Sequence, residues 1–318
     1  MKNTIAVLTA PGKFDFDEHE VEVKPGHLLI KILVCGLCIW EENHFAGRLG
    51  KCPQTLGHEW SGEVVEVGDG VEGFMPGDMV SVLPDELFGF ATYACVPAKS
   101  CYHIADGIDP KTVLGEPVKC VVTVLRSAEV QPGDYAVVSG CGSMGLWCIQ
   151  VLSKMALSKL IAIDLDETRL ELARKYGADV TLNPGNTNVQ EKIREITGGR
   201  MADFVIDGCG SPAVIVDEIG YLRGGRGKLI LMSSHAGPAP SMDFRPAIEK
   251  GIEIRVPHPI YSLDPHDDMR RAINLFNGGV FKTEGIITHE FNLKDIQKGF
   301  ETMAAKTKGY IKGVVYPT

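Results

Sequence analysis

The chain has 318 residues, which is long for a single hydrophobic core, so two domains are expected. With 44% hydrophobic and 23% charged residues, its composition is that of an ordinary globular protein. The net charge of −9 and the lack of any block of Lys or Arg argue against nucleic acid or an acidic membrane surface as the main partner. We therefore expect a small-molecule partner.

The N-terminal segment does not read as a signal peptide. Its only apolar run, Ile5 to Leu8, is too short, and no later stretch approaches the roughly 18 apolar residues of a membrane span. A cytoplasmic protein without a membrane partner is expected. Nine cysteines, an odd number without a secretory signal, are interpreted as reduced thiols or metal ligands rather than as a disulfide framework.

Up to about Asp106 the sequence predicts a compact β-rich domain. Apolar and polar residues alternate in short runs that glycines separate, as is typical of half-buried strands. The expected strands are 27–35, 61–67, 79–83 and 90–96.

From about Val121 the pattern changes to strand, glycine turn, helix and strand, which is typical of a parallel sheet wrapped by helices. The expected strands are 135–139, 160–163, 204–206 and 228–232, and the expected helices are 145–155 and 167–176. The tail should add an amphipathic helix at 268–276 and a strand at 311–315, and pack back onto the first domain. We predict an α/β protein with one domain at 1–118 and 258–318 and a doubly wound domain at 119–257.

A glycine-rich turn follows the expected strand 135–139. Its sequence, Gly140-Cys141-Gly142-Ser143-Met144-Gly145, is a G-x-G-x-x-G pattern that opens a helix, and Asp164 ends the next strand. In dinucleotide-binding domains these glycines permit a tight turn, close approach of the pyrophosphate and close helix packing, and the acid meets the ribose hydroxyls. The predicted NAD contacts are Gly140, Gly142, Ser143, Met144, Gly145 and Asp164. The alternative is a structural turn in a domain that binds no nucleotide.

The acid at Asp164 bears on the choice between NAD and NADP. Its charge repels a 2′-phosphate, which favours NAD, whereas the nearby Arg169 is a residue that can accommodate that phosphate. We expect NAD and count Arg169 among the cofactor contacts.

Four residues, Cys38, His58, Glu59 and Glu116, are candidates for a zinc site. A catalytic zinc takes three protein ligands with nitrogen, sulfur or oxygen atoms and leaves one position open. Spacing alone does not identify such a site here, because the adjacent His58 and Glu59 are no strong metal signature.

The segments around these candidates resemble the zinc-dependent medium-chain dehydrogenase/reductase family. Residues 57–68, GHEWSGEVVEVG, match the pattern G-H-E-x-x-G-x-V-x-x-x-G of that family. Further matches are 35–38 (CGLC), 76–80 (PGDMV), 115–117 (GEP), 207–211 (DGCGS), 224–227 (GGRG) and 287–289 (ITH). The resemblance runs nearly end to end, and the Glu-Pro pair at 116–117 is similar to that of the sorbitol and threonine dehydrogenases.

This resemblance implies a GroES-like catalytic domain joined to a Rossmann domain. It implies a dehydrogenase that transfers a hydride between NAD and a secondary alcohol, such as a polyol, a sugar derivative or an amino alcohol. In that branch Cys, His and Glu hold one zinc ion and a second Glu lies beside it, which by position are Cys38, His58, Glu59 and Glu116. Cys209 joins the expected cofactor contacts. A homodimer or homotetramer is also implied, joined through an edge strand expected near 228–233.

Each of these residues has a simpler interpretation. Cys38 and Cys35 form a C-x-x-C, the pattern of a redox pair. His58 and Glu59 could be a buried hydrogen-bonded pair in a relative that has lost its metal. Glu116 could be an acid that the helix dipole favours at a helix N-terminus.

The sequence leaves the family pattern at two places. Segment 82–90 contains no cysteine and is too short for the lobe that holds a structural zinc, so one zinc per chain is expected. After Cys38, where relatives have a Ser or Thr whose hydroxyl relays the substrate proton, this chain has Trp40, which offers only an N–H donor. We expect Trp40 to line the substrate pocket, and Glu41, Glu116 or His44 to carry protons. His44 could equally be a packing residue.

Two rival functions stay open from the sequence. One is a metal-free reductase of the same fold that acts on an activated double bond or a quinone. The other is a nucleotide-binding protein without catalysis, which the missing relay hydroxyl keeps open.

Overall fold

The computed structural model describes residues 1–234 and 243–317. The chain divides into two compact units. Unit 1 comprises Met1–Lys119 and His266–Thr318, and unit 2 comprises Cys120–Pro265. The limits predicted from the sequence are 118 and 258, so segment 258–265 is grouped with unit 2 rather than with the tail.

Unit 1 contains two sheets. The smaller one has the order β2-β1-β4 and consists of β1 (Lys2–Ala10), β2 (Lys13–Glu20) and β4 (Gln54–Thr55). The larger one has the order β15-β16-β3-β5-β6-β8, with β7 paired to β3. Its strands are β3 (His27–Gly36), β5 (Trp60–Val67), β6 (Met79–Val82), β7 (Tyr93–Pro97), β8 (Cys101–His103), β15 (Ile287–Asn292) and β16 (Lys312–Tyr316).

Strand β3 is the centre of the larger sheet, because it pairs with β5, β7 and β16. Its ten residues, HLLIKILVCG, are almost continuously apolar, as suits a strand with neighbours on every side. At its end Cys35 pairs with Trp60 of β5, and Gly36 pairs with Val314 of β16. Three distant segments therefore meet at one point of the sheet.

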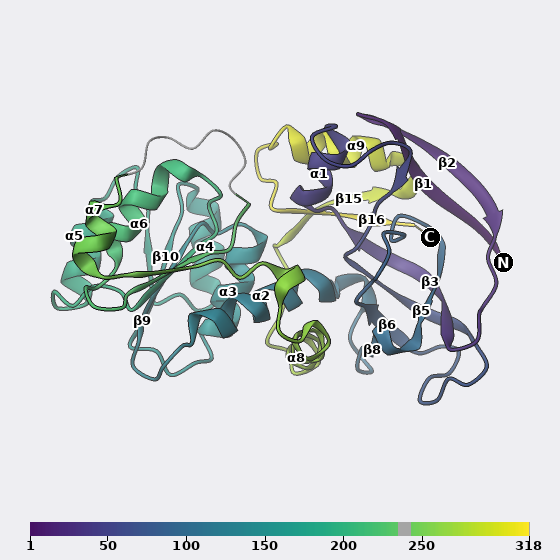
Figure 1. Cartoon of the computed structure of the whole chain (residues 1–318), viewed down its shortest axis with the longest axis horizontal. Coiled ribbons are helices and arrows are strands. Elements are labelled where there is room, and N and C mark those ends of the chain that lie inside the picture. Colours follow the sequence, from purple (N-terminus) through teal and green to yellow (C-terminus); the bar gives the residue numbers. More distant parts are fainter. Residues whose placement is uncertain (235–242, 318) are drawn as a thin grey trace. The chain divides into compact units, whose positions relative to one another are not determined.

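The helices of unit 1 are α1 (Ile39–Phe45), α8 (Pro265–Asn277), α9 (Ile296–Ala304) and the start of α2 (Gly115–Ala128). Figure 1 shows α1 and α9 side by side near β15 and β16. The Phe300 ring of α9 contacts three other rings. The distances between centroids are 5.2 Å to Phe45 of α1, 5.3 Å to Phe14 of β2 and 5.7 Å to Phe90. Burial of these rings holds α1, which follows Cys38, against the sheet.

The described residues of unit 2 form a six-stranded, fully parallel sheet with the order β11-β10-β9-β12-β13-β14, covered by helices. The strands are β9 (Tyr135–Ser139), β10 (Lys159–Ile163), β11 (Val180–Leu182), β12 (Phe204–Asp207), β13 (Lys228–Leu231) and β14 (Glu253–Arg255). The helices are α3 (Ser143–Leu152), α4 (Glu167–Lys175), α5 (Val189–Ile196), α6 (Ile215–Tyr221) and α7 (Arg245–Lys250), and Figure 1 shows helices on both sides of the sheet. This order is that of a dinucleotide-binding domain, which binds its ligand where the order reverses beside β9.

The predicted α/β class and the doubly wound parallel sheet are confirmed. One prediction is wrong: the segment 228–233 is no edge, because β13 is flanked by β12 and β14. The edge is β14, which the sequence analysis missed because it has only three residues and places Ile254 between two charges. The β1–β2 hairpin was also missed, since most of β2 is polar and exposed. Within the described residues no helix is long and apolar enough to cross a membrane.

Candidate functional site

Three of the four predicted zinc ligands meet where β3 ends and β5 begins. Cys38 is the N-cap residue of α1, and His58 and Glu59 directly precede β5. The Gly36 N–H donates to Glu59 O at 2.7 Å, which brings the two segments together. One ligand atom from each of Cys38, His58 and Glu59 lies within 4.8 Å of the other two. A thiol, an imidazole and a carboxylate are a donor set that fits zinc and leaves a fourth position open.

His58 is oriented by Glu41, a fully buried residue of α1. Glu41 Oε1 lies 2.8 Å from His58 Nδ1 and accepts the Gly57 N–H at 2.6 Å. Burial alone would lower the pKa of His58, but the charges of Glu41 and Cys38 outweigh it and raise the pKa well above its usual value. Glu41 Oε1 occupies the Nδ1 side of the imidazole, so Nε2 is the nitrogen left for a metal.

Glu59 is 2% exposed and is neutralised by a buried lysine that the sequence analysis missed. Lys312 Nζ lies 2.5 Å from Glu59 Oε2 and donates to Leu37 O at 2.9 Å. Burial opposes the charge of Lys312, but Glu59 and Cys38 outweigh it and raise the pKa of the ammonium above its usual value. Lys312 reaches the site because β16 pairs with the end of β3.

Gly36 leaves the space that the Glu59 side chain fills. A Cβ atom at this position would lie 2.1 Å from Glu59 Oε2, far closer than two such atoms can approach. Gly36 therefore belongs to the architecture of the site, although its role is visible only once β3 and the Glu59 segment are in place.

Glu116, the fourth predicted ligand, lies beside this group and is not a member of it. It stands in the first turn of α2, with Oε2 3.9 Å from His58 Nε2 and Oε1 3.3 Å from the Nζ of the buried Lys119. Glu116 thus approaches the imidazole at Nε2, whereas Glu41 approaches it at Nδ1. The carboxylates of Glu41 and Glu116 can therefore have different roles in the site.

Trp40 stands next to His58, with the two rings edge to face at 5.6 Å between centroids. The side chain is 38% exposed, so it borders the site without being buried in it. The His44 ring packs against the Trp40 ring, with 4.4 Å between the centroids. His44 Nδ1 lies 2.9 Å from Gln54 Oε1. Among the described residues, its buried Nε2 has no hydrogen-bond partner. Cys35 and Cys38 are both free thiols.

In the predicted dinucleotide turn, each glycine is surrounded differently. Gly140 has φ +93°, and a Cβ there would lie 2.7 Å from the Gly208 carbonyl carbon. A Cβ at Gly145 would lie 1.9 Å from Gly140 O, so α3 packs directly on the turn. At Gly142, by contrast, no atom of the described residues lies within 4 Å of a Cβ. The turn is therefore closely packed at Gly140 and Gly145. It is open at Gly142, where a pyrophosphate would approach.

The remaining predicted cofactor residues surround this turn. Ser143 and Met144 form the start of α3, and Arg169 lies in α4. Asp164, which follows β10, accepts the Cys141 N–H at 2.7 Å through Oδ2 and the Asp166 N–H at 2.9 Å through Oδ1. The exposed Cys209, after β12, has its Sγ 3.4 Å from Ser139 Oγ. All these residues follow the carboxyl ends of β9, β10 and β12.

Comparison with known proteins identifies the family of the chain. Residues 24–106 match the model of the alcohol dehydrogenase GroES-like domain, and residues 143–277 match that of zinc-binding dehydrogenases. The chain is 30% identical to L-threonine 3-dehydrogenase of Caldanaerobacter subterraneus over 330 residues, which cover 93% of each protein. The chain belongs to the zinc-type medium-chain dehydrogenase/reductase superfamily. It is accordingly an oxidoreductase of the alcohol dehydrogenase type.

Two further relatives of this superfamily align over the whole chain. Sorbitol dehydrogenase of Halalkalibacterium halodurans is 27% identical over 100% of this chain and 99% of its own length. The crystal structure of 2R,3R-butanediol dehydrogenase from Bacillus subtilis superposes with a TM-score of 0.86 at 25% identity, over 99% of this chain and 100% of that one. The GroES-like and Rossmann domains predicted from the resemblance are confirmed.

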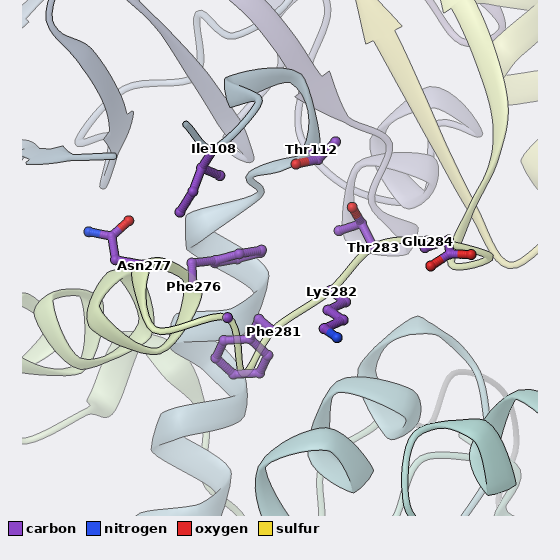
Figure 2. A pocket seen from close by; sticks show the side chains of 9 residues that line it. Ile108, Thr112, Phe276, Asn277, Phe281, Lys282, Thr283 and Glu284 are labelled. Carbon is purple, nitrogen blue, oxygen red and sulfur yellow. The ribbon is translucent and has the colours of Figure 1, made fainter. Parts of the chain in front are cut away.

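Unit 1 of this superfamily member also has a hollow that none of the metal-ligand candidates lines (Figure 2). It has a volume of about 370 Å³ and is walled partly by the rings of Phe276 and Phe281, whose centroids are 5.4 Å apart. Lys282, Thr283 and Glu284 line one side of it (Figure 2). None of its lining residues was predicted as a site residue, and it contains no group of metal-ligating side chains.

Proposed function

We propose that this chain is a zinc-dependent dehydrogenase that transfers a hydride between a secondary alcohol and NAD. The convergence of the Cys38, His58 and Glu59 ligand atoms within 4.8 Å is the observation that carries this proposal. The open space over Gly142 and the carboxylate at Asp164 support the nucleotide half of it. Similarity to threonine, sorbitol and butanediol dehydrogenases favours a polyol, sugar derivative or amino alcohol as substrate.

Zinc held by these three residues would act as a Lewis acid that lowers the pKa of the substrate hydroxyl, and nicotinamide would take up the hydride. Other residues of the chain fix the positions of the proposed zinc ligands. Glu41 keeps the His58 Nδ1 proton in place, so Nε2 stays free to bind. Lys312 holds the Glu59 carboxylate in place, because its ammonium group offsets part of the cost of burying that carboxylate.

The proton of the substrate hydroxyl passes in this proposal to Glu116. Its Oε2 is the carboxylate oxygen next to His58 Nε2, and its Oε1 lies 3.3 Å from the ammonium group of Lys119. Glu41 has a positioning role instead, because His58 and Gly57 hold its Oε1. Trp40 takes no proton, and its ring narrows the space beside His58.

NAD is preferred over NADP in this proposal because of Asp164. Two backbone N–H groups, those of Cys141 and Asp166, fix its carboxylate beside the glycine turn. A fixed negative charge at this position repels a 2′-phosphate and can bind ribose hydroxyls. Arg169 is the residue whose interaction with a 2′-phosphate would weaken the preference.

We also propose that the enzyme is a homodimer or a larger homo-oligomer joined through β14. Strand β14 is at the edge of the parallel sheet, and no other strand of the described residues pairs with its outer side. Apolar side chains in and after this strand are exposed: Ile254, Val256, Ile260, Tyr261 and Leu263. An unpaired edge flanked by exposed apolar residues is a natural surface for a second copy.

The proposed function is tested by measuring zinc in the purified chain and screening polyols and amino alcohols with NAD and with NADP. The absorbance of the reduced cofactor reports turnover, before and after treatment with a chelator. The variant Cys38→Ser should lose the zinc ion of unit 1 and activity together, whereas the matched control Cys95→Ser should retain both. Activity without zinc and after chelation would instead identify a metal-free reductase. Binding of zinc and NAD without turnover on a broad panel would favour a non-catalytic protein.

A further inference from the structure

Unit 2 contains a group of metal-ligating side chains outside the sites described above. Asp207 is the last residue of β12, Cys209 lies in the turn after it, and Glu218 belongs to α6. One ligand atom from each of the three lies within 4.8 Å of the other two. Asp207 and Glu218 are fully buried, while Cys209 reaches the surface.

The charged side chains that act on Glu218 and Cys209 are negative. Asp207 and Asp217 act on Glu218, and the carboxylates of Glu218, Asp207 and Asp164 act on Cys209. Burial, aided by Asp207, raises the pKa of Glu218 to about 8, and burial likewise raises the pKa of Cys209 to about 11. Unlike Glu59, which has Lys312, Glu218 has no ion pair with a lysine or arginine among the described residues. The site therefore favours a positive charge from outside the protein.

Glu218 also lacks hydrogen bonds. Neither of its carboxylate oxygens has a hydrogen-bond partner among the described residues. The Ser139 hydroxyl is close enough to favour the charged form of Glu218, but it falls short of hydrogen-bond geometry with that carboxylate. Asp207 differs, because its Oδ1 accepts the Cys209 N–H at 2.8 Å. A buried carboxylate without a partner is costly, which points to a ligand that the group is shaped to bind.

We propose that Asp207, Cys209 and Glu218 form a second cation site, specific for a divalent ion of the zinc class. A sulfur ligand excludes magnesium and calcium, which take oxygen ligands, and favours zinc and its neighbours. Two carboxylates and a thiolate supply the three protein ligands, and the exposed side of Cys209 gives access for the ion. The ion displaces the protons of the thiol and of Glu218, and its charge offsets the buried carboxylates.

This site adjoins the dinucleotide turn. A Cβ at Gly140 would lie 2.8 Å from Cys209 N, so the turn after β12 and the glycine turn are in direct contact. Ser139, the last residue of β9, lies against the Cys209 thiol. A cation held by Cys209 would fix the backbone on which the glycine turn rests.

The test uses the full chain in a Cys38→Ser, His58→Ala background, which removes the site in unit 1. After chelation, Zn²⁺ binding is measured by competition with a chromophoric chelator, and Co²⁺ is used as an absorbing substitute. We expect one ion per chain and a thiolate-to-Co²⁺ charge-transfer band. Cys209→Ser should abolish that band, and Cys209→Ser and Glu218→Gln should each weaken Zn²⁺ binding at least tenfold.

Matched controls separate the site from general effects. Asp217→Asn removes an exposed acid next to Glu218, and Cys95→Ser removes a thiol of unit 1, so both should leave Zn²⁺ binding unchanged. Zn²⁺ should raise the melting temperature of the background protein and should not raise that of its Cys209→Ser form. Since Glu218→Gln replaces the buried carboxyl group with a neutral group of similar shape, its metal-free form should remain folded, and its melting temperature checks this.

Two results would overturn the proposal: a background protein that binds no Zn²⁺, or an affinity that Cys209→Ser and Glu218→Gln leave unchanged. The first result would mean that only protons neutralise this group. The wild-type chain distinguishes this proposal from the proposed function. It should hold two ions if both are right, but one ion sensitive to Glu218→Gln if zinc is absent from unit 1.

Discussion

At the scale of single residues, the position of Glu59 depends on a glycine. Because a Cβ at residue 36 would lie 2.1 Å from Glu59 Oε2, Gly36→Ala must push the carboxylate away from Lys312 and from the metal-ligand group. Displacing a metal ligand or its supporting group costs about 10- to 100-fold in metal affinity. We expect zinc affinity to fall by that amount and kcat/KM to fall with it.

The control for Gly36→Ala is Gly224→Ala. Gly224 has an ordinary backbone conformation, and the nearest atom to a Cβ there is 3.8 Å away, so its substitution should leave zinc content unchanged. Zinc affinity is measured by competition with a chelator and folding by circular dichroism. A folded Gly36→Ala protein with wild-type zinc affinity would show that zinc binding depends neither on the space at residue 36 nor on this position of Glu59.

At the scale of elements, the turn between β9 and α3 contains one residue that should matter for ligand binding and not for folding. Gly142 is the N-cap of α3, with φ −70°, and no atom of the described residues lies within 4 Å of a Cβ there. Gly142→Ala should therefore fold with wild-type stability. The added methyl group, however, would occupy the space through which pyrophosphate approaches the helix N-terminus.

We expect Gly142→Ala to weaken NADH binding at least tenfold while the melting temperature changes little. Fluorescence titration with NADH and thermal unfolding measure the two quantities. Gly145→Ala is the contrasting variant, because its Cβ would lie 1.9 Å from Gly140 O and should reduce stability as well. Unchanged NADH affinity in Gly142→Ala would place the nucleotide elsewhere.

Helix α6 carries a titratable group that should make stability depend on pH. The pKa of Glu218 is raised from an ordinary 4.5 to about 8, mainly by burial. Between these values the folded, metal-free protein holds a proton that the unfolded chain has lost. This contribution to stability is therefore complete below about pH 4.5 and is lost as pH rises to about 8, at about 1.4 kcal/mol per pH unit.

Denaturant unfolding of the metal-free protein between pH 5 and 8 tests this expectation. Because other groups titrate as well, the useful quantity is the difference between wild type and Glu218→Gln. The variant should lose less stability than wild type as pH rises, and Asp217→Asn should behave like wild type. Parallel pH profiles for wild type and Glu218→Gln would mean that Glu218 keeps an ordinary pKa.

The same elements show which parts of the fold can be predicted. Strand β9 was predicted with its limits because a central parallel strand is buried on both faces and is continuously apolar. The charged residues of β14 give no such signal, although neighbouring strands make it part of the sheet. Cys38, His58 and Glu59 were predicted from local motifs that resemble those of the dehydrogenase family. Lys312 was not, because it reaches Leu37 across 275 residues, and only strand pairing brings the two together.

At the scale of the whole molecule, the edge strand β14 determines how copies of the chain would assemble. A strand with one unpaired side can extend the sheet of a second copy, and residues after it expose large apolar side chains. Val256 is 68% exposed, Tyr261 83% and Leu263 98%. In water such side chains are unfavourable, and burying them in an interface would contribute roughly 25 cal/mol for each Å².

We therefore expect wild type to sediment as a dimer or a larger species at micromolar concentration. The double variant Ile254→Lys, Val256→Lys should be a monomer, because two facing copies would bring four buried ammonium groups together without partners. Met75→Lys is the matched control, since Met75 is also an exposed apolar residue but lies in unit 1. A monomeric wild type, or a double variant that sediments with the wild-type mass, would rule out β14 as the interface.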